Sequence, residues 1–153
     1  SHKSVHNAAA GYWGIATRAM PPCQVLCAYD ASFGAGLLDA MAQVVHDQVP
    51  VLLIAYDSEY PEPLFSKRPV PDCAGVALLL TPARTAHSLA GLQVQATRQL
   101  ADTMSQDALE GLRMQVPAMR ALPLLQSLAC RHTSSVCLDY LPPMQLMLEL
   151  SPC

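Results

Sequence analysis

Two apolar runs on either side of a helix-like segment constrain the fold more than any other feature of the sequence. The runs are "CQVLCAY" (23–29) and "VPVLLIAYD" (49–57), and their length and composition are typical of buried strands. Between them, residues 31–48 place apolar and small residues at helical spacings of three and four: Phe33, Gly34, Leu37, Leu38, Met41, Val44 and Val45. This strand–helix–strand order predicts an α/β fold whose core strands are parallel and buried on both faces.

Further strands and helices are predicted on both sides of this unit. "NAAAGYWGIAT" reads as a small-residue helix, and the thirteen prolines make the chain loop-rich after about Ser58. We expect strands at 73–81, 89–99, 135–141 and 144–150, a helix at 105–115 capped by Ser105, and a helix at 117–130 broken or kinked at Pro123. The predicted fold is a single α/β domain over 1–153, with parallel core strands, antiparallel additions and helices packed on the sheet.

The chain opens with a helix, whereas a sheet of this type normally has an earlier β-α-β segment. We therefore expect the 153 residues to be part of a longer protein.

Composition excludes several classes of protein. Hydrophobic residues make up 52% of the chain and charged residues 14%, as in a compact globular domain. The net charge is −3 without a cluster of Lys and Arg, so we expect no nucleic-acid partner. The longest apolar runs, 49–56 and 73–80, are too short to span a bilayer, and the first residues lack a signal-peptide pattern.

The six cysteines do not predict disulfides or a metal site. None forms a C-x-x-C pair, and a chain of this size does not need disulfides to replace a core. We expect reduced thiols and a cytoplasmic location. Cys130, His132 and Cys137 could form a Cys/His metal site, but they lack the paired short spacings of zinc modules. We therefore expect neither a metal nor a cofactor.

The turn between the first strand and the helix carries the candidate chemistry. Asp30 could act as a general base, but a helix N-terminus favours the ionised form and makes it a weak one. A helix cap or a salt-bridge partner is the simpler interpretation. Ser32 is not in a G-x-S-x-G elbow, and Cys27 alternates with strand residues, which favours a packing role.

The ordered motifs resemble those of a known family. They are Asn7, Ala10 and Gly11 in "NAAAG", then Pro22 and "CQVLCA", then the turn 29–32, and Arg68-Pro69 ahead of "DCAGVALLLTP". Residues 7–82 resemble the N-terminal half of β-ketoacyl synthases, which have the thiolase fold, and look closest to the chain length factors of aryl-polyene and related pigment clusters. Residues 83–153 match weakly.

The resemblance places Asp30 where the synthases have their nucleophilic cysteine. A carboxylate cannot replace a thiolate in forming an acyl thioester. The catalytic histidines and the second oxyanion-hole donor of the family lie in a C-terminal half that this chain is too short to contain. The resemblance therefore implies a non-catalytic synthase-like subunit of fatty acid or polyketide-type biosynthesis. Such a subunit pairs with an active synthase and acts on acyl chains held by an acyl carrier protein.

The same resemblance implies roles for the residues around this turn. We expect Tyr29, Asp30, Ser32 and Phe33 to line or plug the former catalytic pocket. Gln24, Val25, Leu26 and Cys27, with the flanking helices, are expected at the subunit interface, because thiolase-fold subunits pair near this strand.

Two other classes of function stay open. One is an active enzyme, either acyl-transferring of the 3-oxoacyl synthase class or thioesterase-like, that uses Cys27, Cys23 or Ser32. The other is a homodimer with a structural or regulatory role.

Overall fold

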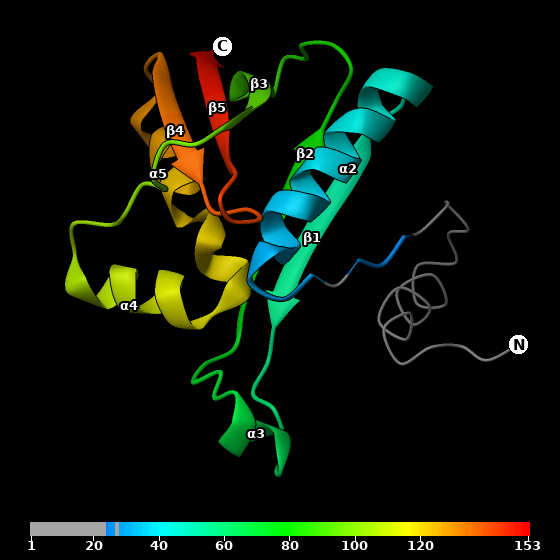
Figure 1. Cartoon of the computed structure of the whole chain (residues 1–153). Coiled ribbons are helices and arrows are strands. Elements are labelled where there is room, and N and C mark those ends of the chain that lie inside the picture. The colour runs from blue at the N-terminus through cyan, green and yellow to red at the C-terminus, as the bar shows by residue number, and fades with distance from the viewer. Residues whose placement is uncertain (1–23, 27) are drawn as a thin grey trace, which may run out of the picture.

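The computed structural model describes residues 24–26 and 28–153. The predicted helix at 7–17, Cys23 and Cys27 lie outside the described residues. The elements are η2 (Tyr29–Ala31), α2 (Ser32–Asp47), β1 (Val51–Asp57), α3 (Leu64–Lys67), β2 (Ala74–Leu80), β3 (Ala90–Thr97), α4 (Asp107–Gln115), η3 (Pro117–Ala121), α5 (Leu122–Cys130), β4 (Ser134–Leu138) and β5 (Gln145–Pro152) (Figure 1).

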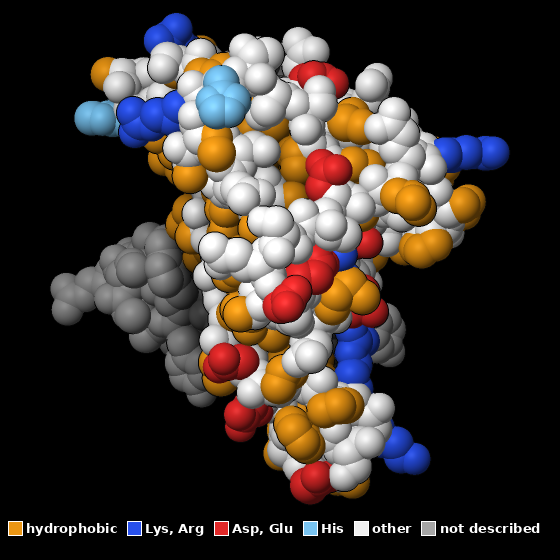
Figure 2. Space-filling model, turned by 90° about the vertical axis from the view of Figure 1, so that its left-hand side faces the viewer, with side chains coloured by type: hydrophobic (Ala, Val, Ile, Leu, Met, Phe, Trp, Pro, Cys, Tyr) orange, Lys and Arg blue, Asp and Glu red, His pale blue; other side chains and the backbone are white. Residues whose placement is uncertain are grey.

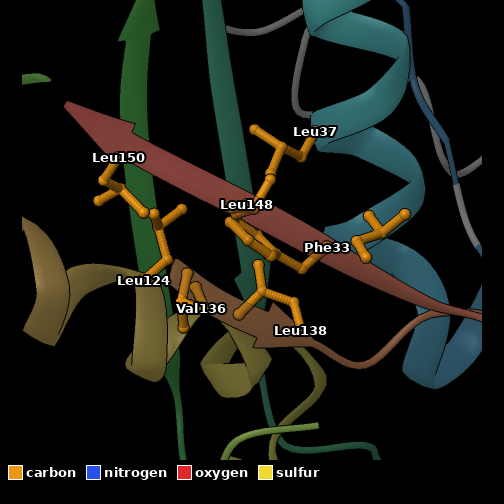
Figure 3. Close-up of a cluster of buried hydrophobic side chains, with 9 residues drawn as sticks. Phe33, Leu37, Leu124, Val136, Leu138, Leu148 and Leu150 are labelled. Atoms are coloured by element: carbon orange, nitrogen blue, oxygen red, sulfur yellow. The ribbon is translucent and has the colours of Figure 1, made fainter. Parts of the chain in front are cut away.

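The described strands form two antiparallel sheets. In the first, β1 pairs with β2, and Val51 lies opposite Leu80 while Asp57 lies opposite Ala74. In the second, β5 is the central strand and pairs with both β3 and β4. The two sheets and α2 bring their apolar faces to one core (Figure 3).

The core joins residues that are far apart in the sequence. Side chains from α2, α5, β4 and β5 point toward one another in Figure 3, and Leu148 of the central strand is fully buried. The cluster consists of Phe33, Leu37, Ala121, Leu124, Val136, Leu138, Leu146, Leu148 and Leu150. Half-buried residues of the first sheet, such as Leu53 and Leu78, pack against it. One hydrophobic core therefore serves both sheets.

Helix α2 agrees with its prediction. Phe33, Gly34, Leu37, Ala40 and Val44 form its buried face. The helix ends where Gln48 adopts a left-handed conformation with φ 55° and donates its backbone N–H to the Val44 carbonyl. This single left-handed residue is a common way for a helix to end.

The parallel core predicted for the first sheet is not present in the described residues. β1 alternates half-buried and exposed positions, so within the described residues only one of its faces is covered, and the burial on both faces predicted for residues 49–57 is not present there. Within the strand predicted at 23–29, Gln24 to Leu26 are exposed and form no strand, and Tyr29 begins the 3₁₀ turn η2. A strand needs a hydrogen-bonded neighbour, and none is paired with these residues or with the second edge of β1 in the described part of the chain.

The second half of the chain follows its sequence pattern with two differences. The strands predicted at 73–81, 89–99, 135–141 and 144–150 form β2, β3, β4 and β5. Helix α4 begins after Gln106 without a side-chain cap, so the cap predicted at Ser105 is wrong. The segment 117–130 divides into η3 and α5, and Pro123 stands in the first turn of α5, where a proline ring is tolerated. The break therefore precedes Pro123.

A close approach at Gly34 joins α2 to the turn between β4 and β5. A Cβ atom added at Gly34 would lie 2.9 Å from the Asp139 carbonyl oxygen and 3.2 Å from Cδ2 of Tyr140. Backbone atoms cannot move away as a flexible side chain can, so this contact requires the missing side chain.

We predict that Gly34→Ala destabilises the protein by about 1–3 kcal/mol, because the added methyl group overpacks this contact. Gly111 provides the matched control, since it is also helical and a Cβ there would meet no atom within 4 Å. Gly111→Ala should raise the free energy of unfolding by about 0.5–1 kcal/mol. Urea unfolding of both variants measures the difference, and equal shifts in the two would contradict the close contact.

Candidate functional site

Asp30 forms an ion pair with Arg68. Asp30 lies in η2, directly before α2, and Arg68 directly follows α3, within the long connection between β1 and β2. Nη2 of Arg68 donates to Oδ1 of Asp30 at 2.5 Å. The Asp30 side chain is 61% exposed and that of Arg68 is 32% exposed. The structure thus brings together two residues that the family resemblance singled out 38 positions apart.

The salt-bridge interpretation of Asp30 is confirmed, and the helix-cap interpretation is wrong. Ala31 occupies the N-cap position of α2 and no side chain caps the helix there. A capping residue normally has extended backbone angles, whereas Ala31 has φ −83° and ψ −1° because η2 leads straight into the helix.

The other residues predicted at the turn have separate environments. Tyr29 begins η2, and its side chain is not among those described. The Ser32 hydroxyl accepts a hydrogen bond from the backbone N–H of Ala28 at 3.0 Å. Phe33 is 1% exposed and belongs to the main core. Among Asp30, Ser32 and Phe33, Asp30 is therefore the residue with an exposed polar side chain, and Phe33 anchors the start of α2.

The structure offers no catalytic base near Ser32 from the same helix. His46 lies in the last turn of α2, where its Nδ1 is 2.8 Å from Oδ1 of Asp47. At 1.5 Å per residue, it is about 20 Å along the helix from Ser32. His87 and His132 are exposed. A Ser32–His46 pair is thus excluded by the length of α2.

A second group of charges lies beside the start of α2 and was missed by the sequence analysis. Arg113 is 4% exposed. Its Nε donates to Glu110 at 2.5 Å and its Nη1 donates to Asp139. The backbone N–H of Met104 donates to the second oxygen of Glu110 at 3.0 Å, and Arg120 lies 3.5 Å from Asp139. The Glu110–Arg113 spacing of three on a helix is visible in the sequence, but the link to Asp139 is not.

These charges fix the turn that meets α2. Arg113 belongs to α4 and holds the side chain of Asp139, whose carbonyl oxygen faces Gly34. The buried guanidinium is paired with two carboxylates, which offsets the cost of removing its charge from water. The cluster therefore ties α4 and the β4–β5 turn to the helix that carries Asp30 at its start.

The described cysteines differ in their exposure to solvent. Cys137 is buried, and burial, followed by the charges of Asp102 and Asp139, raises the pKa of its thiol. Cys73, Cys130 and Cys153 are exposed and free. Within the described residues no three His, Cys, Asp or Glu side chains are placed to hold a metal ion, so Cys130, His132 and Cys137 do not converge.

The distribution of charge on the surface and the length of the helices bear on binding to nucleic acids and on spanning a membrane. On the face shown in Figure 2, Lys and Arg side chains do not gather into one basic patch. Among the helices of the described residues, none is both long and apolar enough to cross a bilayer.

We predict that Arg113→Met lowers the free energy of unfolding by about 3 kcal/mol, because it removes the buried guanidinium that joins Glu110 to Asp139 and leaves Asp139 with Arg120 at 3.5 Å. The exposed pair provides the control, and Asp30→Asn should change stability by less than about 1 kcal/mol. Chemical denaturation of both variants tests the contrast. Similar losses in the two would contradict a structural role confined to Arg113.

Glu110 should make stability depend on pH. The hydrogen bond from Met104 N–H holds the pKa of Glu110 below its ordinary value of 4.5; partial burial opposes this effect, and Arg113 adds to it. Because the folded-state pKa is the lower one, ionised Glu110 stabilises the fold above the unfolded-state pKa. That contribution is lost as pH falls through the folded-state pKa. We predict a smaller loss of stability on acidification in Glu110→Gln than in the native protein, and parallel pH profiles would refute it.

Comparisons with known proteins identify the family and the fold. The model of the family described as "Beta-ketoacyl synthase, N-terminal domain" matches residues 2–139. A solved structure from Xenorhabdus doucetiae, titled as the ketosynthase ApeO in complex with its chain length factor ApeC, matches at 21% identity with a TM-score of 0.66. The match covers 95% of this chain and 54% of the other, so this chain spans about half the length of that protein. No curated protein matches.

The structural match confirms the predicted thiolase-like half-domain, although the described strands pair antiparallel. The family match includes the turn with Asp30, the ion-paired Arg68 and most of the second sheet. The chain belongs to the family of β-ketoacyl synthase N-terminal domains.

Proposed function

We propose that the protein is a non-catalytic β-ketoacyl-synthase-like subunit of the chain length factor type. It pairs with an active synthase in fatty acid or polyketide-type biosynthesis and acts on acyl chains held by an acyl carrier protein. The Asp30–Arg68 ion pair is the observation that carries this proposal. The resemblance assigns Asp30 to the position of the nucleophilic cysteine, and an ion-paired carboxylate cannot form the acyl thioester that condensation requires.

The solved structure supports the pairing by analogy. Its title describes a ketosynthase in complex with its chain length factor, which is a statement about those two proteins. A subunit that has lost its nucleophile retains a use in such a pair, because it can contribute surface and cavity walls without chemistry. The whole of 1–153 then acts as one synthase-like domain, and its free thiols fit a cytoplasmic location.

The segment from Gln24 to Cys27 is the proposed partner surface. Val25 is 43% exposed and Leu26 is 46% exposed, while Gln24 accepts a hydrogen bond from Gln43 of α2 at 2.8 Å. Exposed apolar side chains on an anchored segment are suited to burial against a second subunit. Tyr29, Asp30, Ser32 and Phe33 are proposed to line or plug the former pocket, with the exposed Asp30 at its open side.

Incubation with acyl-carrier-protein thioesters, followed by intact-mass spectrometry, tests the absence of covalent chemistry. We predict no acyl adduct on the native protein. Asp30→Cys is the positive control, because a thiolate beside the Arg68 guanidinium is favoured and reactive. An adduct on the native protein that is lost in Cys27→Ala, Cys23→Ala or Ser32→Ala would show an active enzyme and overturn the proposal.

Co-expression tests the pairing itself. The chain should co-purify with a synthase encoded nearby, and Leu26→Glu should abolish co-purification, because a charge would be buried at the interface. Leu100→Glu, at a side chain 88% exposed in the loop after β3, is the matched control and should leave the complex intact. A stable homodimer that ignores the synthase would favour a structural or regulatory homodimer instead.

A further inference from the structure

The two sheets differ in the chemistry of their outer faces. On β3 and β5, the outward positions include Gln93, Gln95 and Glu149, and Glu149 accepts a hydrogen bond from Ser135 of β4 at 2.6 Å. On β1 and β2, the outward positions are Leu52, Ile54, Tyr56, Gly75, Ala77 and Leu79. The outer face of β3 and β5 is suited to contact with water, whereas the outer face of β1 and β2 is not.

The apolar side chains on the outer face of β1 and β2 are continuous and exposed. Leu52 lies opposite Leu79 and Ile54 lies opposite Ala77 in the strand register. The exposed fractions are 49% for Leu52, 53% for Ile54, 60% for Tyr56 and 67% for Leu79. Isolated exposed leucines need no explanation, but a continuous apolar face on a sheet marks a surface that is covered.

We propose that residues 8–17 of this same chain, which lie outside the described residues, cover this face. No Asp, Glu, Lys or Arg occurs between Ser4 and Thr17, so the segment has little to offer water. In the predicted helix, Ala9, Tyr12, Trp13 and Ala16 share one face at spacings of three and four. Small residues beside two aromatic rings suit close packing on a flat apolar sheet.

The connection is long enough for this placement. The described chain begins at Gln24, which is held to Gln43 on α2. Six extended residues, 18–23, span about 20 Å, enough to pass round the edge of β1 that does not pair with β2. Ten helical residues are about 15 Å long, and the seven residues of β1 rise about 23 Å, so the segment fits within the face.

Fluorescence of Trp13, which is the sole tryptophan of the chain, tests the proposal directly. The native protein should show emission typical of a buried indole. Leu79→Glu should shift that emission to longer wavelength, because a charge on the sheet disfavours packing of the indole against this face. Leu100→Glu is the matched control at another highly exposed leucine, and it should leave the emission unchanged. Circular dichroism verifies that both variants remain folded.

Three outcomes would overturn the proposal. Emission of a water-exposed indole in the native protein, or emission that ignores Leu79→Glu, would mean that Trp13 does not lie on this face. Emission that becomes buried only at concentrations where gel filtration shows a dimer would assign the face to a second copy. None of these outcomes affects the proposed loss of catalysis, which rests on Asp30 and has a separate assay.

Discussion

Helix α2 shares one core with both sheets, and the other features of the structure depend on this burial. Phe33 and Leu37 project from its first two turns toward Leu146 and Leu148 of β5, while half-buried residues of β1 and β2 pack against the same cluster. Fully burying a side chain of this size contributes about 1.5–3 kcal/mol. The start of α2 is therefore fixed by packing. Asp30, in the turn before it, takes its position from the core and needs no cap of its own.

Two groups of charges flank this helix start and have different physical roles. The Asp30–Arg68 pair is open to solvent, where exchange with water and side-chain entropy leave little net stabilisation. The Glu110–Arg113–Asp139 cluster is drawn into the protein and holds a backbone turn against Gly34. The turn before α2 is thus held by packing on one side, and its exposed carboxylate is ion-paired with Arg68 on the other.

Local periodicity in the sequence predicted α2, β1 and the strands and longer helices that follow, but it missed α3 in the proline-rich loop and wrongly predicted a strand over Gln24 to Leu26. The spacing of Phe33, Leu37 and Val44 predicted α2, and the alternation in 89–99 predicted β3. The family resemblance identified Asp30 and Arg68 but could not give their contact, because 38 residues separate them. Arg113 and Asp139 are 26 residues apart and carry no joint signal. The apolar run 49–57 predicted a strand with both faces buried. In the described residues only one face of β1 packs against the core, because no described element lies on the other.

The contact between Asp102 and β4 has a consequence for solubility. Asp102 donates its backbone N–H to the Cys137 carbonyl and accepts the Cys137 N–H on its side chain, both at 2.8 Å. One residue thereby takes the hydrogen bonds that a neighbouring strand would otherwise make with the centre of β4. Exposed strand edges are templates for edge-to-edge aggregation, and a buried strand as apolar as "VCL" would be a strong one. In the described part of the chain the second sheet ends at β4, and Asp102 occupies the hydrogen-bonding groups of Cys137 on that outer edge.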